Sequence, residues 1–166
     1  MKKVIIFLFV ITLCLCISNK EEQIIIPKES IRFRIIANSN SVKDQLLKME
    51  IKKELLPIFN TFSEDNISSM RESIKNSLPL IEEKISNYTS NYTINFGTNY
   101  FPEKTYQNLI YNEGEYESLV ISLGNAVGDN WWCVLFPPLC LLEAEKDNLD
   151  DITYKSYIKT IINKHF

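Results

Sequence analysis

Few residues of this chain have the types and the spacing that enzyme chemistry requires. The sequence holds a single histidine, His165, beside the last residue. Cys133 and His165 could form a nucleophilic pair, yet a catalytic base needs rigid support, and residues at chain ends tend to fray. A histidine at the end of a helix also interacts favourably with the helix dipole, and we prefer this structural interpretation.

Carboxylates are the other candidates for chemistry. Glu113, Glu115 and Glu117 lie close together in the sequence, and Asp129 precedes two tryptophans. A glycosidase needs two carboxylates at a defined separation across a groove, whereas an acidic turn is usually only solvated. The sequence contains no H-x-x-x-H, C-x-x-C or phosphate-binding glycine motif. We therefore predict a protein that is not an enzyme and needs no metal or cofactor.

Charge and composition exclude further classes. The chain has 166 residues, 45% of them hydrophobic, which suits one compact domain with appendages. Its 18 basic and 21 acidic residues give a net charge of -3. Such a chain has no strong positive field to attract nucleic acid or an anionic membrane surface, so we expect no nucleic-acid partner.

The beginning of the sequence resembles an export signal. Lys2 and Lys3 precede an apolar run from Val4 to Ile17 that one threonine interrupts. A positive start before a short apolar core is typical of secretory signals, and the run is shorter than the roughly 20 residues of a comfortable membrane-spanning helix. We expect a cleaved signal, with an uncleaved anchor as the alternative. The rest of the chain would then be exported, and residues 4–17 would be its one contact with the membrane.

The four cysteines fall into two pairs. Cys14 and Cys16 lie in the export signal, while Cys133 and Cys140 lie in the exported part. An even pair in an exported domain can form a disulfide, and two buried thiols are the alternative. Pro137-Pro138 between them can turn the chain back, so we favour the disulfide.

The first half of the chain predicts a strand followed by two helices. Apolar residues at 31, 33 and 35 alternate with Arg32 and Arg34, which indicates a strand with one buried face. A helix is expected from Ser41, its N-cap, to Phe59. That helix is apolar on two sides, so we interpret it as lying between a sheet and the next helix, with a partner on one face as the alternative. A second helix should begin near Ser63 and be kinked or split at Pro79.

The second half predicts about four strands and a terminal helix. Alternation marks strands near residues 92–96 and 119–123, an apolar run marks another at 131–136, and residues 106–111 also resemble a strand. Segregated helices and strands indicate an α+β fold: a single small domain whose mostly antiparallel sheet is packed by two to three helices, preceded by an N-terminal signal or anchor helix. We divide the chain into residues 1–18 (signal or anchor), 19–30 (linker or short edge segment), 31–142 (the domain) and 143–166 (a C-terminal helical tail).

Three segments carry a family resemblance. The first is Ile31-Arg32-Phe33-Arg34-Ile35-Ile36-Ala37-Asn38-Ser39-Asn40 with Asp44-Gln45, and the second begins at Phe101-Pro102 and continues to Tyr116-Glu117. The third and most specific is Asn130-Trp131-Trp132-Cys133-Val134-Leu135-Phe136-Pro137-Pro138-Leu139-Cys140. Together they resemble the stage II sporulation protein R family, over about residues 30–142.

The resemblance implies a signalling role in endospore formation. Such a protein would be exported from the forespore into the space between two cells, where it would activate a membrane-embedded aspartic protease that processes a pro-sigma factor. An activator acts by binding one state of its target better than another. Adjacent tryptophans in a strand point to opposite faces, and Trp often anchors interfaces. We therefore expect the partner surface to include, or be supported by, Arg34, Asn38, Asn130, Trp131 and Trp132.

Two alternatives come from other classes. One is an exported cell-wall hydrolase that uses Cys133 or the acidic turn at Glu113, and the other is a structural envelope protein. A wall-degradation assay with Cys133→Ser would separate the hydrolase from the activator.

Overall fold

A computed structural model of the chain describes residues 24–106, 109–140 and 151–166. The signal or anchor helix predicted for residues 1–18 lies outside them. Within the described ranges, no helix combines the length and apolar character needed to cross a membrane. The elements follow in the order β1 (Ile24–Ile25), β2 (Ile31–Ile36), α2 (Val42–Phe59), α3 (Ile67–Ser86), β3 (Tyr92–Phe101), β4 (Lys104–Tyr106), β5 (Leu109–Tyr111), β6 (Gly114–Leu123), β7 (Asn130–Phe136) and α5 (Asp151–His165).

The fold is α+β, as predicted, but its sheets are mixed. The larger sheet has the strand order β3-β6-β2-β7, and the smaller one has the order β1-β5-β4. Because β2 runs parallel to β6 and β1 runs parallel to β5, the prediction of a mostly antiparallel sheet was wrong. Alternation of apolar residues shows which face of a strand is buried, but it carries no information about the direction of the neighbouring strand.

The order of the strands in the larger sheet puts β2 and β6 side by side as parallel neighbours. After β2 the chain makes two helices, and β3 then pairs antiparallel with β6 over ten residue pairs. Strand β6 inserts between β3 and β2, while β7 returns antiparallel on the other side of β2. The two central strands are therefore β6 and β2.

The helix ends follow local capping chemistry. The Ser41 side chain accepts a hydrogen bond from the Asp44 backbone N–H, which confirms Ser41 as the N-cap of α2. The cap of α3 is Asn66, not Ser63, because the Asn66 side chain accepts from two backbone N–H groups of the first turn. Helix α3 also continues through Pro79 without a break. Pro79 is exposed, so water can hydrate the carbonyl that loses its donor.

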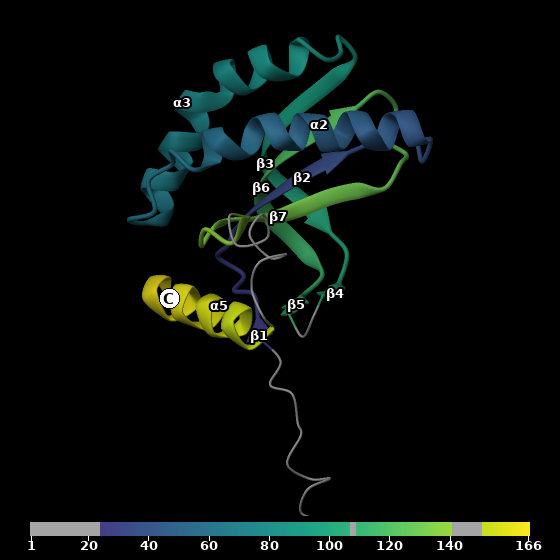
Figure 1. Cartoon of the computed structure of the whole chain (residues 1–166). Helices are drawn as coiled ribbons and strands as arrows, with labels where there is room; N and C mark the ends of the chain where they lie inside the picture. Colours follow the sequence, from purple (N-terminus) through teal and green to yellow (C-terminus); the bar gives the residue numbers. More distant parts are fainter. Residues whose placement is uncertain (1–23, 107–108, 141–150) are drawn as a thin grey trace, which may run out of the picture.

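The main core lies between the larger sheet and the two long helices. Figure 1 shows α2 and α3 on one side of this sheet and α5 with the small sheet on the other. Strand residues Phe33, Ile35 and Ile121 are fully buried there. The helix residues that cover them are Ile51, Leu55, Ile74, Ile81 and Ile85.

A second, smaller core occupies the opposite face of the larger sheet. It is formed by Ile24, Ile26, Tyr111, Val134, Leu139 and Ile158. Ile24 and Ile25, within the segment interpreted as a linker or edge segment, form edge strand β1. The single strand expected over residues 106–111 is instead parts of two antiparallel strands, β4 and β5.

Helix α2 is packed on one side only. Its inner apolar residues Ile51, Leu55 and Ile58 are buried. Along its outer side, however, Val42, Leu46 and Met49 are 77%, 60% and 44% exposed. Leu56, the fourth apolar residue of this side, is partly buried against the main core. The interpretation that the helix is enclosed on both sides was wrong for Val42, Leu46 and Met49. Helix α3 lies on the same side of the sheet and packs into the same core, so it does not cover these residues.

Candidate functional site

The adjacent tryptophans lie on opposite faces of β7. Trp131 packs edge-on against Phe33 of the main core, 5.9 Å between ring centroids, and Lys52 Nζ lies 4.2 Å from the Trp131 ring. Trp132 packs against Tyr111, 4.6 Å between centroids, at the second core. Both rings are partly exposed, so each joins a core while keeping some surface in solvent.

Strand register shows which predicted surface residues share a face. Arg34 pairs with Trp132, Ile36 with Asn130, and Ile35 with Trp131. Because alternate residues share a face, Arg34, Trp132 and Asn130 lie on the face of the second core, and Trp131 lies on the helix-covered face. The structure therefore brings together three of the five residues and separates Trp131 from them.

Asn38, the fifth residue, organises a loop. Its Nδ2 donates to Asp44 Oδ2 and its Oδ1 accepts from the Asn125 backbone N–H, both at 2.9 Å. The Asn38 backbone carbonyl accepts from Val127 N at 3.3 Å, and Asn40 Oδ1 accepts from the Asp129 N–H. These bonds fasten the β6–β7 loop to the turn before α2, so Asn38 supports the start of β7.

Sequence reasoning missed a buried arginine beside this face. Arg32 is fully buried, and its guanidinium carbon lies 3.4 Å from the Tyr116 ring centroid. The Phe101, Tyr111 and Trp132 rings surround it at 5.3, 5.8 and 5.5 Å. Burial lowers the pKa of Arg32, against the opposing effect of Tyr116 and Tyr111. Alternation had assigned Arg32 to a solvent face; the only hint in the sequence is the number of aromatic residues after residue 100.

Arg34 lies beside this aromatic cluster. Its guanidinium carbon is 4.5 Å from the Phe101 centroid, and burial lowers its pKa. A guanidinium over an aromatic face is stabilised by the ring quadrupole, by up to about 2 kcal/mol when both are desolvated. We call Arg32, Arg34, Phe101, Tyr111, Tyr116 and Trp132 the arginine–aromatic cluster.

The residues proposed for hydrolysis are otherwise engaged. Cys133 and Cys140 are joined in a disulfide, so neither sulfur is a thiol nucleophile. His165 has its two ring nitrogens 2.8 and 2.9 Å from the backbone carbonyls of Ile161 and Glu64. In the acidic turn, Glu117 receives two bonds from Arg71 Nε, at 2.8 and 2.9 Å.

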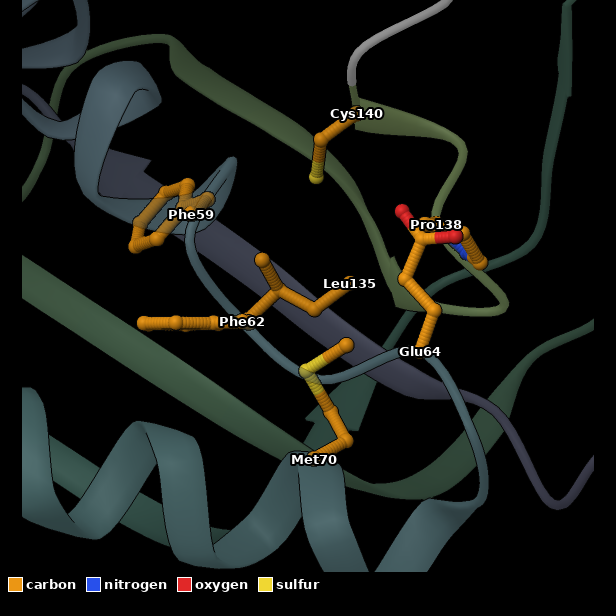
Figure 2. Close-up of a pocket in the computed structure, with 7 residues that line it drawn as sticks. All are labelled: Phe59, Phe62, Glu64, Met70, Leu135, Pro138 and Cys140. Carbon is orange, nitrogen blue, oxygen red and sulfur yellow. The ribbon is translucent and has the colours of Figure 1, made fainter.

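Two hollows lie near the residues considered for hydrolysis, one beside the disulfide and one at the acidic turn. Beside the disulfide, a cavity of about 10 Å³ has room for about one water molecule. Figure 2 shows that its lining is mostly apolar: Phe59, Phe62, Glu64, Met70, Leu135, Pro138 and Cys140. A wider hollow of about 370 Å³ lies at Glu113 and Glu115, next to Lys28. No group of three metal-ligating side chains occurs among the described residues.

Comparison with known proteins gives the family. The family model for stage II sporulation protein R matches residues 27–146. Stage II sporulation protein R of Bacillus subtilis (strain 168) is 36% identical over 159 residues, covering 87% of this chain and 70% of that protein. No solved structure matches. The matched range spans the positions of the disulfide and of the arginine–aromatic cluster, and the chain belongs to the stage II sporulation protein R family.

Proposed function

We propose that this protein is an exported signal of endospore formation that activates a membrane-embedded aspartic protease, which then processes a pro-sigma factor. The observation that carries the proposal is family membership across residues 27–146. The protein would act in the space around the forespore, and residues 4–17 would direct its export or anchor it. It would act as a non-enzymatic activator.

Two structural features support this proposal. Disulfides persist in oxidising compartments outside the cytoplasm, and Cys133 and Cys140 are bonded. The same bond removes the thiol on which the hydrolase alternative with Cys133 depends. Activation by binding needs only a stable surface with differential affinity for two states of the protease, and Arg34, Asn130 and Trp132 share one face of the sheet.

Co-expression in a non-sporulating host tests the proposal. The full chain would be produced with the sigma-processing protease of the same organism and its pro-sigma substrate, and substrate length would be followed by immunoblot. We expect shortening of the substrate only when all three proteins are present. Full-length substrate, with all three proteins folded and correctly located, would refute the proposal.

A matched variant tests the location. The double substitution Leu8→Lys and Ile11→Lys interrupts the apolar run Val4 to Ile17 without touching the described domain. We expect this variant to accumulate in the cytoplasm and to leave the substrate unprocessed. Equal processing by the retained variant would mean that activation does not require export.

A further inference from the structure

The larger sheet presents two arginines on one face, and neither has a carboxylate partner among the described residues. Arg32 and Arg34 are two residues apart on β2, so their side chains point the same way. Arg32 Nε and Nη1 and Arg34 Nε are buried without a hydrogen-bond partner. The hydrogen bond from Arg32 Nη2 to the Asn112 carbonyl is long, at 3.5 Å.

Arg71, by contrast, has a carboxylate partner. Its Nε donates to both carboxylate oxygens of Glu117, and this bond raises the pKa of Arg71. By contrast, the pKa of Arg34 is lowered, with burial as its cause. Buried polar groups normally have partners. The buried Nε of Arg34 cannot reach an outside ligand, so a ligand would have to meet the outer nitrogens, Nη1 and Nη2, for which the described residues supply no carboxylate.

Of the two arginines, Arg34 is the one that reaches the protein surface. Arg32 is fully buried, whereas Arg34 is partly exposed. Across the sheet, Arg34 is level with Val120 and Asn95, and the next row holds Ile36, Ser122 and Thr93. Asn95 and Thr93 are exposed. The second core covers the other end of this face, around Val134. Arg34 therefore lies at the boundary between the covered end and an open, polar end.

We infer that Arg34 is the anchor point for a carboxylate side chain of the partner protein, which docks on the open end of this sheet face. The inference rests on the proposed function, in which that partner is the membrane protease. A guanidinium matches a carboxylate with two parallel hydrogen bonds, and the Phe101 ring holds the guanidinium in place. The neutral Asn95, Ser122 and Thr93 lie in the row of Arg34 or in the next row of the same face, where they can contact the rest of the docked segment.

The surroundings favour an acidic protein segment over an anionic membrane. Recognition of acidic lipids typically uses clusters of four to eight basic residues. The neighbours of Arg34 on the open end are neutral, and the whole chain carries a net charge of -3. A single guanidinium among hydrogen-bonding side chains fits one Asp or Glu.

Charge exchange in the co-expression assay tests the inference. Arg34→Glu should reduce substrate processing at least tenfold, because it places two carboxylates together. Replacing the contacting acidic residue of the protease with Lys should restore processing by the Arg34→Glu variant, because opposite charges meet again. The same protease variant should process less substrate with the unmodified chain, because Lys then faces Arg34. Arg34→Gln, which removes the charge without repulsion, should give an intermediate loss. The control Lys75→Glu reverses an exposed charge on α3, on the opposite side of the sheet, and should leave processing unchanged.

The outcomes separate this inference from the proposed function. Full processing by a folded Arg34→Glu variant would overturn the inference while leaving the activator role intact. If Arg34→Glu unfolds, as judged by its melting curve, Arg34→Gln decides: unchanged processing overturns the inference. If the unmodified chain itself fails to activate, the proposed function fails, and a binding measurement decides the ligand chemistry.

That measurement uses the arginine Nε–H signals. The sequence contains three arginines, Arg32, Arg34 and Arg71, so the ¹⁵N-arginine-labelled full chain in zwitterionic micelles gives three signals. With N-acetylglutamate as the probe, the Arg34 signal should shift and saturate. The Arg71 signal should stay fixed, because Glu117 already occupies its Nε. No Arg34 shift, or an equal shift with the neutral N-acetylglutamine, would overturn the carboxylate assignment.

Discussion

The guanidinium carbon of Arg32 lies 3.4 Å from the ring centroid of Tyr116. At that distance the planar group stacks on the ring, and the rings of Phe101, Tyr111 and Trp132 close the remaining sides. These five residues come from β2, β3, β5, β6 and β7. Arg32 therefore links the larger sheet to the small one through aromatic contacts rather than through an ion pair.

This stacking predicts an order of stability at residue 32. Arg32→Lys keeps the charge but replaces the planar, weakly hydrated guanidinium with a strongly hydrated ammonium. Burying the ammonium costs more free energy, because it loses more hydration. We expect Arg32→Lys to lower the free energy of unfolding by about 2 kcal/mol or more. Arg32→Met removes the buried charge and retains much of the volume, so its loss should be smaller. Urea unfolding followed by tryptophan fluorescence measures both.

Arg71 provides the control for this comparison. Its ion pair with Glu117 is partly exposed, and such pairs contribute about 1 kcal/mol or less. Arg71→Lys and Arg71→Met should therefore differ little from each other. If Arg32→Lys and Arg32→Met had equal free energies of unfolding, the four aromatic rings would act only as apolar packing. They would then not be a site that prefers the planar guanidinium.

The β6–β7 loop makes a second prediction through Gly128. A Cβ atom at Gly128 would lie 2.3 Å from the Ser39 carbonyl oxygen, which is backbone and cannot rotate away. We expect Gly128→Ala to lower the free energy of unfolding by about 1–3 kcal/mol. At Gly97 the nearest atom would be Asn95 Oδ1 at 3.5 Å, an ordinary contact. Gly97→Ala should therefore be neutral or slightly stabilising. Similar losses of unfolding free energy for Gly128→Ala and Gly97→Ala would contradict the close approach of the β6–β7 loop to the turn before α2.

The helices and the strands of the main core follow from local patterns. The 3.6-residue period, the Ser41 cap and the alternation at residues 31–35 are properties of short segments, so they predict α2, much of α3 and β2. The parallel pairing of β2 with β6 depends on where a much later strand inserts, since paired residues such as Arg34 and Val120 are 86 positions apart. No local pattern carries that information.

In the candidate site too, the features that depend on short segments were predictable from the sequence, and those that depend on distant strands were not. The alternation of side chains along a strand is enough to place Trp131 and Trp132 on opposite faces, and the structure confirms this. The burial of Arg32 depends on rings from four later strands, so alternation within β2 assigned the residue to solvent. Asn38 was expected on or beneath a partner surface, and its bonds to Asp44 and Asn125 show that it holds the loop.

Asp44 makes stability depend on pH at the acidic end. Hydrogen bonds from Ser39 and Asn38 hold the pKa of the Asp44 carboxyl below its usual 3.8. The unfolded state therefore binds the proton more tightly, and the stability that Asp44 contributes is complete above pH 3.8. It is lost as the pH falls through the lowered folded-state pKa. The stability difference between the unmodified chain and Asp44→Asn should shrink as the pH is lowered from 6 towards 2. A difference that stays constant with pH would contradict these bonds.

The two sides of α2 make the last prediction. Leu55 is fully buried in the main core, whereas Leu46 is 60% exposed on the outer side of the same helix. Leu55→Ala should lower the free energy of unfolding by about 2–5 kcal/mol, since it removes buried methyl groups and leaves a cavity. Leu46→Gln should change it by less than about 0.5 kcal/mol. Thermal or urea unfolding of both variants checks this. A large loss at Leu46 would mean that the outer side is covered in solution, as the sequence pattern alone had suggested.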